Sequence, residues 1–388
     1  MSQPAKPDTC LTRRHWMVLA ASAVSAGCGG GATSIAGLPG TGGTGVIFTQ
    51  GTISGFGSVI INGVRFDDTA ARVMLDGQTL SATDLRLGMV ATVQGERGAD
   101  VTLGTASSIE VWSIAQGLVS SGRAVPGATG EFTVAGMTVR TDPGTVFEGS
   151  SAAMPLMPGQ RVAVWGLQAG VDARSWSATR VASVSASSVV STGLIGVSNS
   201  QRSLNGMMLA GDPVRGLADG ALVRALGALS TADGALLVQS VQLLGVGAAT
   251  PLQGEVEIEG VVTSMASAAS FNLGNIAVDA SQASYKPAGA QISRGARLQV
   301  NGSWQSGVLK ASSIELEDEQ SPKTVEISGR IELFTSLANF VLRGQRCDAS
   351  GVTVSPGTVA DLKVGVKVKL KGLKAGDVLR VTALGLDD

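Results

Sequence analysis

The sequence predicts an all-β protein, built as a tandem array of five small OB-like Greek-key β-barrels after a signal peptide and a Gly-rich tether. Three observations support this prediction. A glycine-bounded motif recurs five times, short Val- and Leu-rich runs alternate with turn residues, and the composition disfavours long helices. The 388 residues include 53 glycines and 14 aromatic residues, and 15% of them are charged. Such a composition is typical of short strands joined by tight turns.

The repeated motif places an apolar residue three positions before a glycine, and an alternating run then leads to a second glycine seven positions later. Alternation of this kind puts successive side chains on opposite faces, as in a β-strand. Repetition along the chain favours several small modules over two or three ordinary domains. The five copies occupy residues 85–95, 156–166, 217–227, 292–302 and 362–372.

The first repeat shows the expected elements in order. A strand opens at Gly51, and two short strands flank the turn Asn62-Gly63, which is a strong hairpin signal. Asp84 is placed to cap a single helical turn that ends at Gly88. The alternating strand and a closing strand follow. Five short strands with one helical turn before the fourth fit an OB-type barrel.

The later repeats carry the same landmarks, and the third is abbreviated. Its opening and motif glycines are 27 residues apart, against 35 to 42 elsewhere, so we expect a shortened strand or hairpin there. Each repeat has about 60 residues, a size at which a lone core is marginal, so neighbouring modules should support each other. The predicted segments are a signal peptide over 1–27, a tether over 28–50, and repeats over 51–114, 116–185, 191–245, 254–318 and 326–388.

Residues 55–66 (GFGSVIINGVRF) and 84–90 (DLRLGMV) resemble a bacterial family of exported repeats catalogued as a domain of unknown function, DUF5666. The resemblance is closest in the first repeat and poorest in the third, and it covers about 330 residues. It implies an exported protein made of such modules. It brings no established activity, catalytic residue or cofactor, and none is predicted.

The N-terminus predicts export. Arg13 and Arg14 precede about eleven apolar or small residues, which is the layout of a signal peptide and too short for a retained membrane anchor. The arginine pair also resembles the twin-arginine export motif. Residues 26–28 (AGC) resemble the end of a lipobox, in which Cys28 is diacylated and becomes the new N-terminus. Ser25 departs from that pattern, because Leu is usual at this position.

Lipidation of Cys28 predicts an envelope lipoprotein that is anchored without a spanning helix. Gly29 lacks the aspartate associated with inner-membrane retention, so we expect the outer membrane, with the protein facing the periplasm or the cell surface. Cleavage by ordinary signal peptidase after Ala23 or Ala26 is the alternative and would give a soluble periplasmic or secreted protein.

Processing also excludes several chemistries. The single histidine, His15, lies in the removable segment, so the processed chain has no Ser-His-Asp, Cys-His or histidine-ligated metal site. With 26 basic and 29 acidic residues left after removal, no net basic charge attracts nucleic acid. Cys347 would be the remaining thiol besides lipidated Cys28, and we expect a small buried hydrophobe there rather than a nucleophile.

Two acidic groups are candidates for binding or catalysis. The pair Asp67-Asp68 follows a strand, and Glu255, Glu257 and Glu259 fall on one face of another. We interpret the pair as a solvated turn and the three glutamates as solvent-facing charge that guards a sheet edge. Binding of a divalent cation is the alternative for both groups.

Lys367, Lys369 and Lys371 alternate with apolar residues and form a candidate anion-binding face on the fourth strand of the fifth repeat. A solvated edge or a face for an anionic glycan or lipid head group both fit, whereas nucleic acid normally requires more aromatic stacking. Four tryptophans are candidate sugar platforms or packing residues, and packing is the commoner use. They are Trp112, Trp165, Trp176 and Trp304.

These observations predict a non-enzymatic envelope lipoprotein whose modules bind an unidentified protein or glycan partner or serve a structural role. A carboxylate-based glycan hydrolase is one alternative and needs two acidic residues that converge in a cleft. A periplasmic metal or anion binder is the other.

Overall fold

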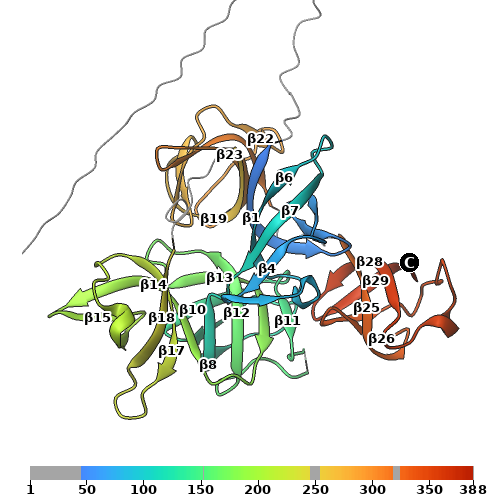
Figure 1. Cartoon of the computed structure of the whole chain (residues 1–388), viewed down its shortest axis with the longest axis horizontal. Coiled ribbons are helices and arrows are strands. Elements are labelled where there is room, and N and C mark those ends of the chain that lie inside the picture. Colours follow the sequence, from blue (N-terminus) through green and yellow to red (C-terminus); the bar gives the residue numbers. More distant parts are fainter. Residues whose placement is uncertain (1–44, 152, 245–253, 318–323, 388) are drawn as a thin grey trace, which may run out of the picture. The chain divides into compact units, whose positions relative to one another are not determined.

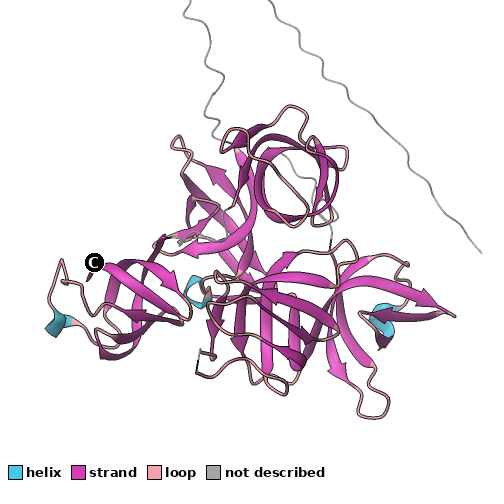
Figure 2. Ribbon diagram, turned by 180° about the vertical axis from the view of Figure 1, so that it is seen from behind, coloured by secondary structure: helices cyan, strands magenta, loops and turns pink. Residues whose placement is uncertain are grey.

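The computed structural model describes residues 45–151, 153–244, 254–317 and 324–387. Strands account for nearly all of the regular structure, and each helical element is a single short turn (Figures 1 and 2). The all-β prediction is confirmed.

Each repeat closes a five-stranded barrel by the same pairing. The first strand pairs antiparallel with the second and the fourth, and the third runs parallel to the fifth. This is the order of an OB-like Greek key. Barrel 1 comprises β1 (Val46–Gly55), β2 (Val59–Ile61), β3 (Val64–Asp67), β6 (Val90–Arg97) and β7 (Leu103–Val111). Barrel 2 comprises β8 (Ala115–Arg123), β9 (Gly130–Val134), β10 (Met137–Thr141), β12 (Arg161–Gln168) and β13 (Ser175–Ser183).

The other three barrels follow the same scheme. Barrel 3 comprises β14 (Val189–Ser198), β15 (Gln201–Leu204), β16 (Met207–Ala210), β17 (Leu222–Leu229) and β18 (Leu236–Leu243). Barrel 4 comprises β19 (Glu255–Ser267), β20 (Ser270–Leu273), β21 (Ile276–Asp279), β23 (Arg297–Gln305) and β24 (Val308–Leu316). Barrel 5 comprises β25 (Thr324–Ser336), β26 (Asn339–Leu342), β27 (Gln345–Asp348), β28 (Lys367–Ala375) and β29 (Val378–Leu386).

Among the described residues, the third repeat lacks a short parallel pairing with its fifth strand that the other four repeats make, in barrel 5 as the single bridge between Val354 and Leu384. In barrels 1, 2 and 4 a strand that follows the third barrel strand pairs parallel with the fifth. Between β16 and β17, all of which the structure describes, the chain forms only the turn η2 (Asp212–Val214). The extra strands are β4 (Arg72–Leu75), to which β5 (Gln78–Leu80) is paired, β11 (Val146–Glu148) and β22 (Ser284–Lys286).

The helical turns lie before the fourth strand, as expected, but the cap differs in the first repeat. Ser81 is the N-cap of η1 (Ala82–Asp84), and its hydroxyl accepts from the Thr83 amide. Asp84 lies at the end of this turn and accepts from the Ser81 amide, which completes a capping box. The expectation that Asp84 caps the turn was therefore wrong. The turn before β28 is η3 (Val359–Asp361).

The two motif glycines have the same roles in all five repeats. The first has a positive φ, and its amide donates to the opening strand, as Gly88 does to Ile53 at 2.9 Å. The second stands at a β-bulge, where an added Cβ would lie 2.0 to 2.5 Å from a backbone carbonyl oxygen of the fifth strand. Only glycine satisfies both positions without strain.

Barrels 1 and 4 share a sheet. Strand β1 begins at Val46, five residues before the predicted start, and residues 47–50 pair parallel with β19. The predicted tether is therefore too long at its C-terminal end, because the alternation of buried Ile47 and Thr49 with less buried neighbours continues the strand. A single pairing, Val190 with Gln116, links barrel 3 to barrel 2.

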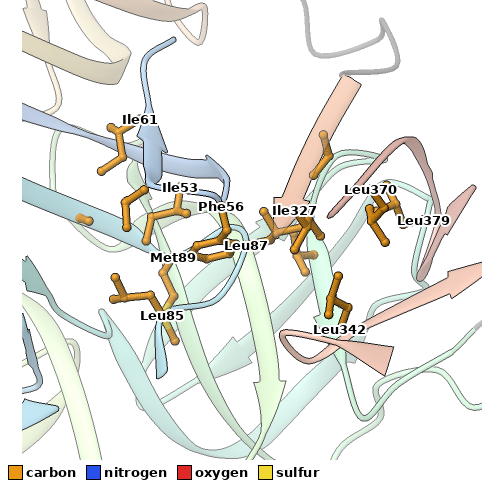
Figure 3. Packing of buried hydrophobic residues seen from close by; sticks show 14 of the residues in the cluster. Ile53, Phe56, Ile61, Leu85, Leu87, Met89, Ile327, Leu342, Leu370 and Leu379 are labelled. Carbon is orange, nitrogen blue, oxygen red and sulfur yellow. The ribbon is translucent and has the colours of Figure 1, made fainter. Parts of the chain in front are cut away.

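The barrels also share a hydrophobic core. One cluster runs from barrel 1, with Phe56 and Leu87, into barrel 5, with Ile327 and Leu342, and includes residues of barrel 2 (Figure 3). Backbone hydrogen bonds join the same two barrels, since Phe56 donates to Glu326 and Ser328 donates to Phe56. Barrels 2, 3 and 4 have further clusters of their own. Burial shared between modules compensates for their small size.

Candidate functional site

A cavity of about 640 Å³ lies where barrels 1, 2, 4 and 5 meet. Its wall combines polar side chains with backbone and aliphatic groups, and none of the described residues that line it is aromatic. Barrel 1 contributes Thr52, Ser54 and Asn62 to the polar lining, and barrel 2 contributes Asp142, Thr145 and Thr179. Barrel 4 contributes Glu259, Arg297, Gln299 and Glu315, and Glu317 directly follows its last strand. Barrel 5 contributes Thr324 and Lys374.

One wall is a buried ion pair. Arg297 Nε donates to Glu259 Oε1 at 2.6 Å, and the Thr52 amide donates to Glu259 Oε2 at 2.6 Å. A second guanidinium nitrogen donates to the Thr52 hydroxyl at 2.9 Å. Burial opposes the charge on Arg297, but the neighbouring Glu259 carboxylate outweighs it and raises the pKa of the guanidinium. The charges of Glu259 and Arg297 in barrel 4 are therefore fixed in this wall by hydrogen bonds to Thr52 of barrel 1.

Glu257, two residues before Glu259 on β19, lies in the same interface between barrels 1 and 4. Its carboxylate accepts from Arg97 of barrel 1 at 2.8 Å and also from Gln299. Glu257 is 2% exposed and Glu259 is 6% exposed. The interpretation of these glutamates as solvent-facing charge on a sheet edge was wrong, because β19 is covered by β1 and is no edge. Only Glu255, which also pairs with Arg97, is substantially exposed.

Lys374 brings a basic group to the cavity from barrel 5. Its ammonium nitrogen Nζ lies 2.8 Å from the Gly144 carbonyl and also contacts the Thr145 carbonyl, both in barrel 2. Burial lowers the pKa of Lys374 to about 7. At neutral pH a substantial fraction of this amine is therefore unprotonated, whereas an exposed lysine is almost fully charged.

Carboxylates from two barrels line the same cavity. Asp142 accepts from the Thr145 amide at 2.8 Å, and Glu315 lies 3.8 Å from Lys286. With Glu259 and Glu317 they place four acidic groups around the cavity, against two basic ones, among the described lining residues. These acidic residues line one cavity rather than being scattered over a convex surface.

The structure gives each lysine of the candidate anion-binding face an acidic neighbour. Lys369 and Lys371 contact the Glu326 carboxylate at 2.9 and 3.3 Å, and Lys367 contacts Asp387 at 3.3 Å. Glu326 also pairs with Arg65 of barrel 1. The lysines remain partly exposed on β28, and their use by an anion stays a prediction.

The other predicted residues mostly serve packing. Trp165 and Trp176 are buried, and Trp304 packs against the core of barrel 4. Trp112 lies against Arg224 of barrel 3, with 5.1 Å from the guanidinium carbon to the ring centroid. Cys347 is buried, which raises the pKa of its thiol to about 12. The expectation of a buried thiol is confirmed, and its lack of reactivity stays a prediction.

The pair Asp67-Asp68 forms a turn. Asp67 is exposed and accepts from the hydroxyl and amide of Thr69, which lower its pKa. Partial burial raises the pKa of Asp68, while Arg343 of barrel 5 opposes this shift. In the described ranges no group of three or more His, Cys, Asp or Glu side chains could hold a metal ion.

Cys28, Arg13 and Arg14 lie outside the described residues, so lipidation and export stay predictions. Within the part of the chain that the structure describes, no helix has the length and apolar character needed to cross a bilayer.

Sequence reasoning missed the cavity and the importance of Arg297 and Lys374. The sequence does contain complementary charges, since three glutamates alternate on one strand and Arg97 and Arg297 lie on others. No local pattern tells which strand of which repeat faces them. The partners are set by the pairing of β1 with β19, which belong to repeats far apart in the chain.

Two segments of the chain, residues 116–182 and 259–315, match the family model described as Domain of unknown function (DUF5666). Both segments are therefore similar to DUF5666 domains. The matched segments span nearly all of barrel 2 and most of barrel 4. The predicted family is confirmed, although the family model matches the second and fourth repeats and not the first, where the resemblance looked closest.

Other comparisons add little to the DUF5666 assignment. No curated protein matches the chain. A solved structure titled "drosophila Unr CSD456" is similar at 13% identity, over 44% of this chain and 79% of that one, with a TM-score of 0.14. A score this low establishes no shared arrangement, and the OB-like fold rests on the strand pairing described above.

Proposed function

We propose that this protein is an exported, non-enzymatic lipoprotein of the cell envelope that binds a polar partner in the cavity between barrels 1, 2, 4 and 5. The supporting observation is the cavity itself. Its volume falls within the range of small-molecule sites, and four modules contribute polar groups to it. A shared sheet and the Arg97–Glu257 ion pair join barrels 1 and 4, and a common hydrophobic core with hydrogen bonds joins barrels 2 and 5 to barrel 1. The polar groups are therefore organised before a partner arrives.

The lining favours a polar ligand or the end of a glycan or protein segment. Amide, carboxylate and guanidinium groups are suited to hydroxyl and charged groups of a ligand. Because none of the described residues in the cavity wall is aromatic, they offer no stacking surface for a sugar ring. Recognition would therefore depend on hydrogen bonds, with orientation set by Arg297 and Gln299.

Capture from the native envelope tests this proposal. Tagged protein would be cross-linked in its host, and copurifying protein and polysaccharide would be identified from detergent-solubilised envelope. A Ser54→Trp variant places a large side chain at the cavity wall, whereas Ser107→Trp alters an exposed position on β7 of the same barrel. We expect the partner to be lost with S54W and retained with S107W. Equal recovery with both variants would remove the cavity as the binding site.

A carboxylate-based glycan hydrolase remains a second candidate, because four carboxylates line one cavity. Such an enzyme needs one protonated and one ionised carboxyl group across the substrate. Assays of chromogenic glycosides with wild type, Asp142→Asn and Glu317→Gln test it. Turnover that falls in both variants supports the hydrolase, and absence of turnover across a glycoside panel favours binding alone.

A further inference from the structure

We propose that Lys374 is a carbonyl-reactive amine, which condenses with small aldehydes or ketones that enter the cavity. This inference deepens the proposed binding function and rests on it, because it requires that solutes reach the same cavity. It names a covalent site and a chemical class of ligand.

The hydrogen bonds of Lys374 fit a neutral amine. A neutral amine has two N–H donors and one lone pair, whereas an ammonium has three donors. Among the described residues, the acceptors at Lys374 Nζ are two carbonyls, those of Gly144 and Thr145. Both donors of the neutral form are thus satisfied, and the lone pair remains for an electrophile. Among the described residues that line this cavity, Lys374 is the one lysine.

The electrostatic surroundings favour the neutral form. Burial lowers the pKa of Lys374 to about 7, and Arg180 of barrel 2 acts in the same direction. Asp142 and Asp377 oppose the shift without cancelling it. By contrast, the lysines on the exposed face of β28 contact carboxylates rather than backbone carbonyls.

The reaction balances without an oxidant or reductant. The nitrogen lone pair forms a bond to the carbonyl carbon, and a proton moves from nitrogen to oxygen to give a carbinolamine. Loss of water then forms the imine, and the reaction is reversible. Asp142 lines the same cavity and is the carboxylate suited to move the proton.

Reductive labelling tests the inference on the intact protein. Wild type would be treated with propionaldehyde and cyanoborohydride at pH 7, and modified lysines would be mapped by mass spectrometry over time. At pH 7 the unprotonated fraction of an amine with a pKa near 7 is on the order of 1,000 times that of an ordinary lysine. We expect Lys374 to be labelled at least ~100-fold faster than Lys369 and Lys371, with a rate that rises through about pH 7.

Two variants separate the possible outcomes. Lys374→Arg keeps donors toward the carbonyls, so the fold should persist while the fast label disappears. Thr179→Cys in a Cys28→Ser background replaces a buried hydroxyl of the cavity lining, and its reaction with a small thiol reagent reports whether solutes enter the cavity. If the cysteine reacts but Lys369 and Lys371 are labelled before Lys374, the lysine inference is wrong and the binding proposal stands. If neither the cysteine nor Lys374 reacts, the cavity is closed and both proposals fail.

Discussion

Arg97 of barrel 1 donates to Glu257 of barrel 4 at 2.8 Å, and this ion pair is buried where the two barrels share a sheet. The residues are 160 positions apart in the chain. Their contact links modules that the repeat pattern alone treats as separate. Similar roles fall to Arg180, which donates to the Leu87 carbonyl at 3.0 Å, and to Arg224, which pairs with Asp76 at 2.6 Å.

Removing Arg97 should cost more stability than neutralising its partner. In Arg97→Met the Glu257 carboxylate is left buried without its cation, a change that typically costs about 3–5 kcal/mol. In Glu257→Gln the amide can still accept from Arg97, so we expect a smaller loss. Urea denaturation of both variants at pH 8 provides the measurement, and an equal loss in both would contradict this account of the pair.

Stability should fall between about pH 4.5 and 7 because of Glu257. Burial raises the pKa of this carboxyl to about 7, although Arg97 opposes the shift. The folded state therefore keeps a proton that the unfolded state releases, and the stabilisation present below pH 4.5 is lost as pH rises. The effect should be on the order of 2 kcal/mol. Unfolding at pH 5 and 8 should show a smaller difference in Glu257→Gln than in wild type, and an unchanged difference would exclude Glu257 as the cause.

A bulge glycine should not tolerate a side chain. In Gly302→Ala the new Cβ would lie 2.0 Å from the Lys310 carbonyl oxygen, so the strand must shift. We expect a loss of about 3 kcal/mol, at the upper end of the cost of overpacking. Gly351→Ala is the matched control, because nothing lies within 4 Å of its Cβ position. Similar melting temperatures for the two variants would argue against the bulge requirement.

Glu326→Gln should strengthen any binding of anions to barrel 5. The Glu326 carboxylate contacts Lys369, Lys371 and Arg65, and it occupies groups that an anion would use. Retention on a heparin column should increase in this variant, and the increase should disappear when Lys369 and Lys371 are also changed to Gln. Unchanged retention would argue that the lysines have only a structural role.

Cys28→Ser should release the protein from membranes. Without the thiol no lipid can be attached, and the remaining chain has no other predicted anchor. Fractionation of cells and labelling with radioactive palmitate check this expectation. Wild type should label and sediment with membranes, whereas the variant should do neither. Retention of the variant in the membrane fraction would contradict the lipoprotein prediction.

Much of the fold was predictable because its determinants are local. The two motif glycines are needed for a left-handed turn at Gly88 and a bulge at Gly95, and these backbone requirements recur in every repeat. The alternating run between them sets one face of a strand toward the core. The shortened spacing in the third repeat likewise reflects local structure, since the short parallel pairing with the fifth strand is missing there among the described residues.

The sequence by itself thus determined the strands, the repeats and the burial of Cys347, because each depends on residues near in the chain or on composition. Only the tertiary structure decided which outward-facing charges are buried. Glu257 and Glu259 alternate like solvent-facing residues, yet β1 covers them, because two barrels complete one sheet. The cavity and the carbonyl contacts of Lys374 arise in the same way, from surfaces of distant repeats that meet, and nothing in a single repeat encodes that meeting.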